Sequence, residues 1–172
     1  MERWGADLYG DPCRDCGFDW SLTPEQAVAA VLAAPDRCAE LLRGRTGTER
    51  HPDLGWSAAA YVSHVADNLA MWAGWVMAAR LDGAMVAPGY DPDALAAARR
   101  YEVVPAQAAV WWLRQCAAAW AAAVGPACDA GVELQHARRG RQQAQDVARN
   151  NAHDAHHHVH DVARILAWTP AG

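Results

Sequence analysis

The sequence predicts an all-α protein, a four-helix bundle preceded by an irregular N-terminal segment. Four long stretches carry apolar residues at helical spacing, their ends carry capping signals, and no stretch shows the alternation typical of strands. Helices with one apolar face bury it against one another, so four of them joined by loops favour a bundle. We expect residues 1–22 to be irregular and residues 23–172 to form the bundle domain.

Capping signals delimit the first two long helices. Thr23, followed by proline and then by a glutamine at the capping-box position, predicts a helix over residues 24–43 with a bend near Pro35. Ser57 predicts the start of a second helix that ends at Gly83. Its expected core stripe is Tyr61, Val65, Leu69, Trp72 and Val76.

Proline and glycine delimit the later elements. Asp91 opens a short helix to about residue 101, and Pro105 opens a third long helix that closes at Pro126. The last helix begins near Gln142 and runs to about Trp168. Tryptophans at helical positions are expected in the core: Trp72, Trp75, Trp111, Trp112 and Trp120.

Composition restricts the partners and the compartment. The net charge of −5 argues against nucleic acid, and no apolar run approaches the length of a membrane span. The N-terminus lacks the layout of a signal peptide, and five cysteines do not suit a disulfide framework, so we expect a cytoplasmic protein. All 15 basic residues are arginine and alanine is abundant, a composition typical of a GC-rich genome. The sequence does not decide between a monomer and a homodimer.

Residues 153–161 hold five histidines and two aspartates in the last helix. At about 100° per residue, His158 lies about 45° and Asp154 about 85° from the centre of the apolar stripe, whereas His153 points to solvent at about 175°. Metal ligands on one helix need spacing i, i+4 on the inward face, and only Asp154 and His158 meet both conditions.

A third ligand should come from a facing helix. His64 lies beside the apolar stripe of the second long helix, and Asn68, one turn later, is placed to orient it or a bound water. His64, Asp154 and His158 are therefore the candidate metal ligands. Two histidines and one carboxylate leave coordination positions open, which is typical of a catalytic rather than a structural site.

Two stretches resemble the DinB-like family of metal-binding four-helix bundles, which includes bacillithiol transferases and mycothiol-dependent maleylpyruvate isomerase. GWSAAAYVSHVADN is similar to the family's tryptophan-led second helix, whose histidine is a ligand, and DAHHHVHDVARIL is similar to its last-helix signature. The resemblance implies the same ligands, His64, Asp154 and His158, although the isomerases carry glutamate at the position of Asp154. A shifted register would instead use His153 and His157.

The resemblance also implies a reaction. A divalent ion, zinc with nickel or iron as alternatives, would bind the sulfur of a low-molecular-weight thiol and present it to a small electrophile. The expected activity is that of a thiol S-transferase or thiol-dependent isomerase, with mycothiol as candidate co-substrate. His157 and Asp161 would support the ligands without binding the ion themselves, and Trp56 would line the mouth of the site.

Two other functions use the same ligands. Two histidines and a carboxylate also form the facial triad of non-haem iron oxygenases. A non-catalytic bundle that binds a metal or a small molecule is the third alternative.

Two motifs lie outside the candidate ligand set. Cys13 and Cys16 form a C-x-x-C followed by glycine, which is half of a zinc knuckle, and a redox pair or an inert turn are the alternatives. The basic stretch at residues 138–141 suits either a carboxylate-rich ligand or an exposed turn.

Overall fold

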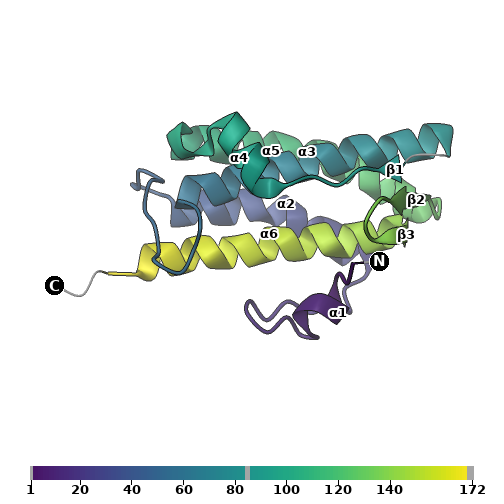
Figure 1. Cartoon of the computed structure of the whole chain (residues 1–172), viewed down its shortest axis with the longest axis horizontal. Helices are drawn as coiled ribbons and strands as arrows, with labels where there is room; N and C mark the ends of the chain where they lie inside the picture. Colours follow the sequence, from purple (N-terminus) through teal and green to yellow (C-terminus); the bar gives the residue numbers. More distant parts are fainter. Residues whose placement is uncertain (1, 84–85, 170–172) are drawn as a thin grey trace.

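The computed structural model describes residues 2–83 and 86–169, and its long helices form the predicted bundle (Figure 1). The elements are α1 (Ala6–Tyr9), α2 (Pro24–Leu41), α3 (Ala58–Asp82), β1 (Val86–Ala87), α4 (Pro92–Arg99), the 3-10 helix η1 (Tyr101–Val103), α5 (Ala106–Asp129), β2 (Glu133–His136), β3 (Gly140–Gln143) and α6 (Ala144–Ala167). Both α2 and α3 pack against α5 and α6, so the four long helices surround one core. The end of the predicted bundle domain, from Pro170, lies outside the described residues. None of the described helices is long and apolar enough to cross a membrane.

The predicted caps form at α2 and α3. The side chain of Thr23 accepts a hydrogen bond from the Gln26 amide, and the Gln26 side chain accepts one from the Thr23 amide. Ser57 Oγ accepts a bond from the amide of Ala60. Gly83 ends α3 in the left-handed conformation, with φ of 69°, that glycine adopts without strain. The helix α2 continues through Pro35, which is buried.

The predicted core is largely confirmed. All members of the expected α3 stripe are buried: Tyr61, Val65, Leu69, Trp72 and Val76. Trp120 is fully buried and donates from Nε1 to Asn151 Oδ1 at 2.8 Å, so its one polar atom is satisfied. The prediction was wrong for Trp111 and Trp112, which are 59% and 38% exposed. They stack on each other on the outside of α5, where apolar spacing does not distinguish a half-covered face from a buried one.

The prediction that no strand is present was also wrong. Strand β1 pairs in parallel with β2, and β2 pairs antiparallel with β3. These strands have only two to four residues, and the inward positions of β2 and β3 include the polar side chains of His136 and Gln142, both buried. Apolar and polar residues therefore do not alternate in the sequence, although burial does alternate in the structure.

Two helix boundaries also differ from the prediction. Pro126 does not close α5, because its carbonyl accepts from the amide of Ala130 and one more turn forms. The last helix begins at Ala144 rather than near Gln142, because residues 140–143 form β3. Proline removes a backbone donor but leaves the acceptor, so a helix can still continue for one turn beyond it.

A buried carboxylate joins α3 to the elements that follow it. Asp67 accepts two bonds from the Arg99 guanidinium at 2.9 Å each, one from Tyr101 Oη at 2.7 Å and one from Trp112 Nε1 at 2.9 Å. Such full pairing is what makes a buried charge tolerable. The network fixes α4 and η1 against the bundle, beside the segment that carries Tyr90.

Replacing Asp67 with alanine is expected to lower the free energy of unfolding by about 3 kcal/mol, because the buried hydroxyl of Tyr101 loses its acceptor. Urea denaturation followed by circular dichroism measures the change. The matched control is Asp36→Ala, which breaks the exposed ion pair with Arg114 and should cost less than about 1 kcal/mol. Equal losses in the two variants would show that the network adds nothing beyond a surface pair.

Candidate metal centre

One turn of polar residues on α3 faces one turn on α6. His64 and Asn68 lie on α3 at spacing i, i+4, and Asp154 and His158 lie on α6 at the same spacing. His64 and Asn68 are buried, and Asp154 and His158 are half-buried. Each pair therefore projects from the bundle wall into the space between the two helices.

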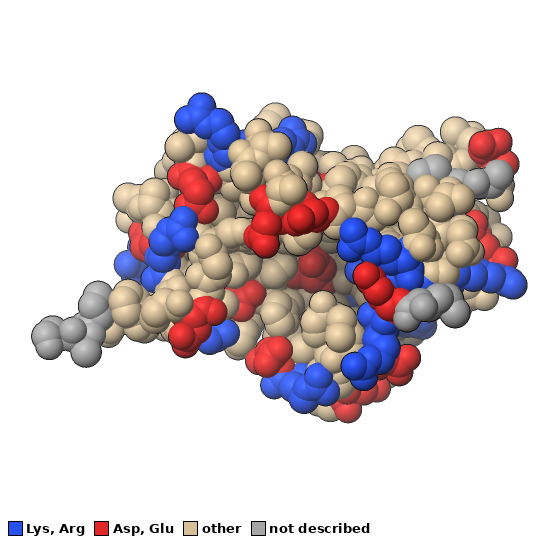
Figure 2. Space-filling model, in the orientation of Figure 1, with Lys and Arg blue, Asp and Glu red and all other residues tan. Residues whose placement is uncertain are grey.

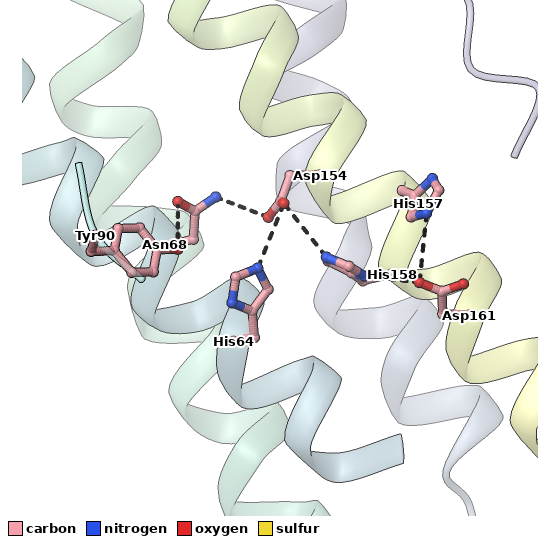
Figure 3. A network of polar contacts seen from close by, with 7 residues as sticks. All are labelled: His64, Asn68, Tyr90, Asp154, His157, His158 and Asp161. Atoms are coloured by element: carbon pink, nitrogen blue, oxygen red, sulfur yellow. Dashed lines mark hydrogen bonds and ion pairs between the residues drawn. The ribbon is translucent and has the colours of Figure 1, made fainter. Parts of the chain in front are cut away.

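Three of these side chains converge, with Asp154 between the two histidines (Figure 3). Asp154 Oδ1 lies 3.7 Å from His64 Nε2 and 3.5 Å from His158 Nε2. Both distances exceed the roughly 2.7–3.2 Å of a hydrogen bond. They are close to the separation of about 3.4 Å between two ligands of one tetrahedral ion with bonds of about 2.1 Å. The spacing and the donor types therefore fit a divalent metal ion.

Neighbouring side chains hold these groups in place. Asn68 Nδ2 donates to Asp154 Oδ2 at 2.9 Å, and Tyr90 Oη donates to Asn68 Oδ1 at 3.2 Å. Asp161 Oδ2 accepts from His158 Nδ1 at 2.9 Å. Asp154 Oδ1 and His158 Nε2 are thereby left free to face the site. Carboxylate or carbonyl partners of this kind orient metal-bound histidines in many proteins.

The ionisable groups of α6 shift one another's pKa values. Burial alone would raise the pKa of Asp154 and lower that of His158. The neighbouring histidines instead hold the pKa of Asp154 well below its usual value, and Asp154 and Asp161 raise the pKa of His158 to about 9. Both pKa shifts favour an ionised carboxylate beside a protonated imidazole when no ion is bound, and metal binding would release that proton.

A cavity of about 470 Å³ opens onto the three residues. Figure 2 shows this face of the molecule hollowed between the bundle and the N-terminal segment, with arginine side chains at the edge near the N-terminus. Trp56 lines the cavity as predicted, and its ring lies 5.0 Å from that of His64. The other aromatic residues of the wall are Trp4, Tyr9, Tyr61, Trp72, Trp75 and Tyr90.

The turn between β2 and β3 supplies a basic wall. Arg138 and Arg139 line the cavity, whereas Arg141 pairs with Glu133 and does not line it. His136 Nδ1 accepts from the amides of Arg138 and Arg139 at 3.1 and 3.2 Å, which places the proton of the neutral ring on Nε2. Burial lowers the pKa of His136 and favours that neutral form.

The orientation of His153 differs from the one predicted from helical periodicity. It was predicted to point to solvent, but it is only 4% exposed. The N-terminal segment covers it, because the rings of Tyr9, Phe18 and Trp20 lie 4.5, 5.4 and 4.6 Å from its own. Burial lowers the pKa of His153 to about 4. Periodicity identifies the face that meets the other helices, but an irregular segment can cover the opposite face.

The structure separates the two predicted ligand registers. His153 and His157 face the N-terminal segment, where they lie close to Cys13 and Cys16, and Asp154 and His158 face His64. His157 Nε2 also lies 3.7 Å from Asp161 Oδ2. The thiols of Cys13 and Cys16 are free, and burial raises the pKa of Cys16 to about 11, opposite to the shift that activates redox thiols.

No model of a known protein family and no curated protein matches the sequence. A solved structure does: YfiT from Bacillus subtilis, a probable metal-dependent hydrolase with an unusual four-helix bundle topology. The TM-score is 0.72 over 87% of this chain and 92% of that chain. The chain has the YfiT fold. At 17% sequence identity the likeness to YfiT supports the bundle that the DinB-like resemblance implied.

Sequence reasoning did not assign several residues that line the cavity of this YfiT-like bundle. Tyr90 lies in the loop between β1 and α4, and His136 was set aside because it lies outside the long helices. Trp4 and Tyr9 belong to the segment predicted as irregular. The aromatic residues of that segment were the available signal, since an exposed irregular tail rarely carries several large apolar side chains.

Proposed function

We propose that the chain is a metal-dependent enzyme that transfers a low-molecular-weight thiol, such as mycothiol, to a small electrophile or isomerises the electrophile through that thiol. One observation carries the proposal: two imidazole nitrogens and a carboxylate oxygen converge at metal-ligand spacing on the wall of an open cavity. His64, Asp154 and His158 would hold the ion, with zinc as first choice and nickel or iron as alternatives.

The chemistry divides between the ion and the chain. When bound, a divalent ion lowers the pKa of a coordinated thiol, so that a thiolate is available at neutral pH. Asn68 and Asp161 contribute by fixing the ligands before substrate arrives. Fixed ligands keep the open coordination positions directed at the cavity, so little reorganisation is needed when the thiol and the electrophile meet.

The cavity walls indicate the class of electrophile. A volume of about 470 Å³ suits a small molecule. Arg138, Arg139 and the Nε2–H of His136 provide donors for a carboxylate, and the tryptophan rings provide an apolar surface for the rest of the molecule. We therefore expect an electrophile with an apolar body and at least one carboxylate.

Hydrolysis is the second candidate reaction, and the likeness to YfiT favours it because that protein is a probable metal-dependent hydrolase. The same three residues would then hold an ion that activates water in place of a thiol. The same cavity would bind the ester, amide or other bond to be hydrolysed.

The test uses metal-free protein reloaded with zinc, nickel or iron(II). Each form is incubated with a panel of carboxylate-bearing electrophiles, with mycothiol and separately with water as the only nucleophile. Free thiol and remaining electrophile are measured over time, and product analysis detects isomerisation without net thiol loss. We expect turnover that requires both the metal and the thiol.

Each other outcome overturns the thiol reaction and points elsewhere. Equal turnover without thiol would replace it with hydrolysis. Oxygen consumption by the iron(II) form without thiol would indicate an oxygenase. Stoichiometric metal binding with no turnover across the panel would leave a metal- or ligand-binding bundle.

A further inference from the structure

The N-terminal segment presents two thiols on one side of a tight turn. The amide of Cys13 donates to the Phe18 carbonyl at 2.9 Å, and the amide of Gly17 donates to the Cys13 carbonyl at 2.8 Å. Gly17 has a φ of 72°, the left-handed conformation that closes such a turn. The resulting C-x-x-C knuckle buries Cys13, partly buries Cys16 and leaves both thiols unpaired.

Two histidines of α6 lie beside these thiols and complete a group of four side chains that could bind a metal ion. His153 and His157 lie one helical turn apart, and a ligand atom from each of the four residues lies within 4.8 Å of the others. His153 Nε2 and His157 Nδ1 are both buried and have no hydrogen-bond partner within the described part of the chain. An unpaired buried nitrogen is costly, and a metal ion would satisfy one on each ring.

We propose that Cys13, Cys16, His153 and His157 bind a second metal ion, Zn²⁺, in a structural site distinct from the His64–Asp154–His158 centre. The spacing is C-x2-C and H-x3-H, within the range of structural zinc sites, and four protein ligands close the coordination shell. Two thiolates and two neutral imidazoles balance the charge of the ion, which suits its buried position. The proposal rests on this geometry and does not require the thiol reaction.

A zinc ion here would add a further attachment of the N-terminal segment to α6, beside the packing of Tyr9, Phe18 and Trp20 against His153. Within residues 2–22, the described regular structure is the four-residue helix α1. His156 Nε2 also contacts the Cys16 carbonyl at 3.1 Å and holds the same turn. Because Trp4, Leu8 and Tyr9 form one wall of the cavity, zinc here would keep that wall in place.

Cobalt(II) distinguishes this site from the first one, because only a thiolate-ligated cobalt ion gives sulfur-to-metal charge-transfer absorption. Metal-free full-length protein, reduced with a phosphine and kept free of small thiols, is titrated with cobalt(II). We expect the charge-transfer band to grow to one equivalent per chain and to disappear on addition of zinc. Cys16→Ser and His153→Ala should each abolish or strongly weaken it.

Matched controls separate loss of a ligand from loss of fold. Cys38→Ser, at a buried cysteine of α2, should keep the full band, and so should His64→Ala, which removes a ligand of the first site. Helical circular dichroism should be unchanged in Cys16→Ser, because this turn lies outside the four long helices. Absence of the band in the wild type, or its persistence in a folded Cys16→Ser variant, would overturn the proposal.

Discussion

Replacement of His158 by alanine is expected to empty the His64–Asp154–His158 centre and to reduce turnover to background. Only His64 on α3 and Asp154 on α6 would then remain, so this centre would keep one ligand on each helix and lose its pair one turn apart. The affinity for zinc should fall by more than the roughly 10–100-fold that loss of an outer partner causes. Competition with a chromophoric chelator measures this affinity. The measurement is made in a variant that also carries Cys13→Ser and Cys16→Ser, so that only zinc bound at the His64–Asp154–His158 centre is measured.

His64→Ala should have the same effect from the opposite helix, which guards against a folding defect peculiar to α6. The control is His160→Ala, because His160 lies on the same helix but belongs to neither group of candidate ligands. This variant should retain the metal and the turnover. If His153→Ala emptied the centre while Asp154→Ala left it filled, the shifted register would be correct and our assignment wrong.

The facing of the candidate ligands was accessible from the sequence because a helix repeats at a fixed angle. Apolar residues such as Val159 and Val162 define the inward direction of α6, and the positions of Asp154 and His158 follow from it. The same reasoning placed His64 on the facing helix. For long helices, local sequence and tertiary packing agree, which is why these three side chains face one another as the spacing indicates.

The other half of the site depends on contacts that periodicity does not encode. His153 is buried by an N-terminal segment with little regular structure, so no repeat in the sequence indicates which face it covers. The hairpin that carries Arg138 and Arg139 is short, and its buried positions include polar residues. Its position against α3 depends on long-range pairing between β1 and β2. Such pairing is set by the whole fold rather than by local propensity.

Replacement of Asp161 by alanine is expected to weaken metal binding at the His64–Asp154–His158 centre by about 10–100-fold without removing a ligand. Asp161 accepts from His158 Nδ1 at 2.9 Å and so keeps the lone pair of Nε2 directed at the site. In its absence the ring is free to rotate and to exchange its tautomer. Asp161→Asn retains an oxygen acceptor, so it should recover part of the affinity lost in the alanine variant.

Recovery of metal affinity in Asp161→Asn would show that Asp161 acts by positioning His158 and not through a general effect on the structure. Arg164→Gln is the matched control, since Arg164 contacts the other carboxylate oxygen of Asp161 at 3.8 Å and is 42% exposed. This variant removes a charge next to Asp161 but leaves the bond to His158, so the metal affinity should change by less than about threefold. If Asp161→Asn bound zinc as weakly as Asp161→Ala, the negative charge rather than the hydrogen bond would control the affinity. Wild-type affinity in Asp161→Ala would instead mean that His158 needs no partner to hold the ion.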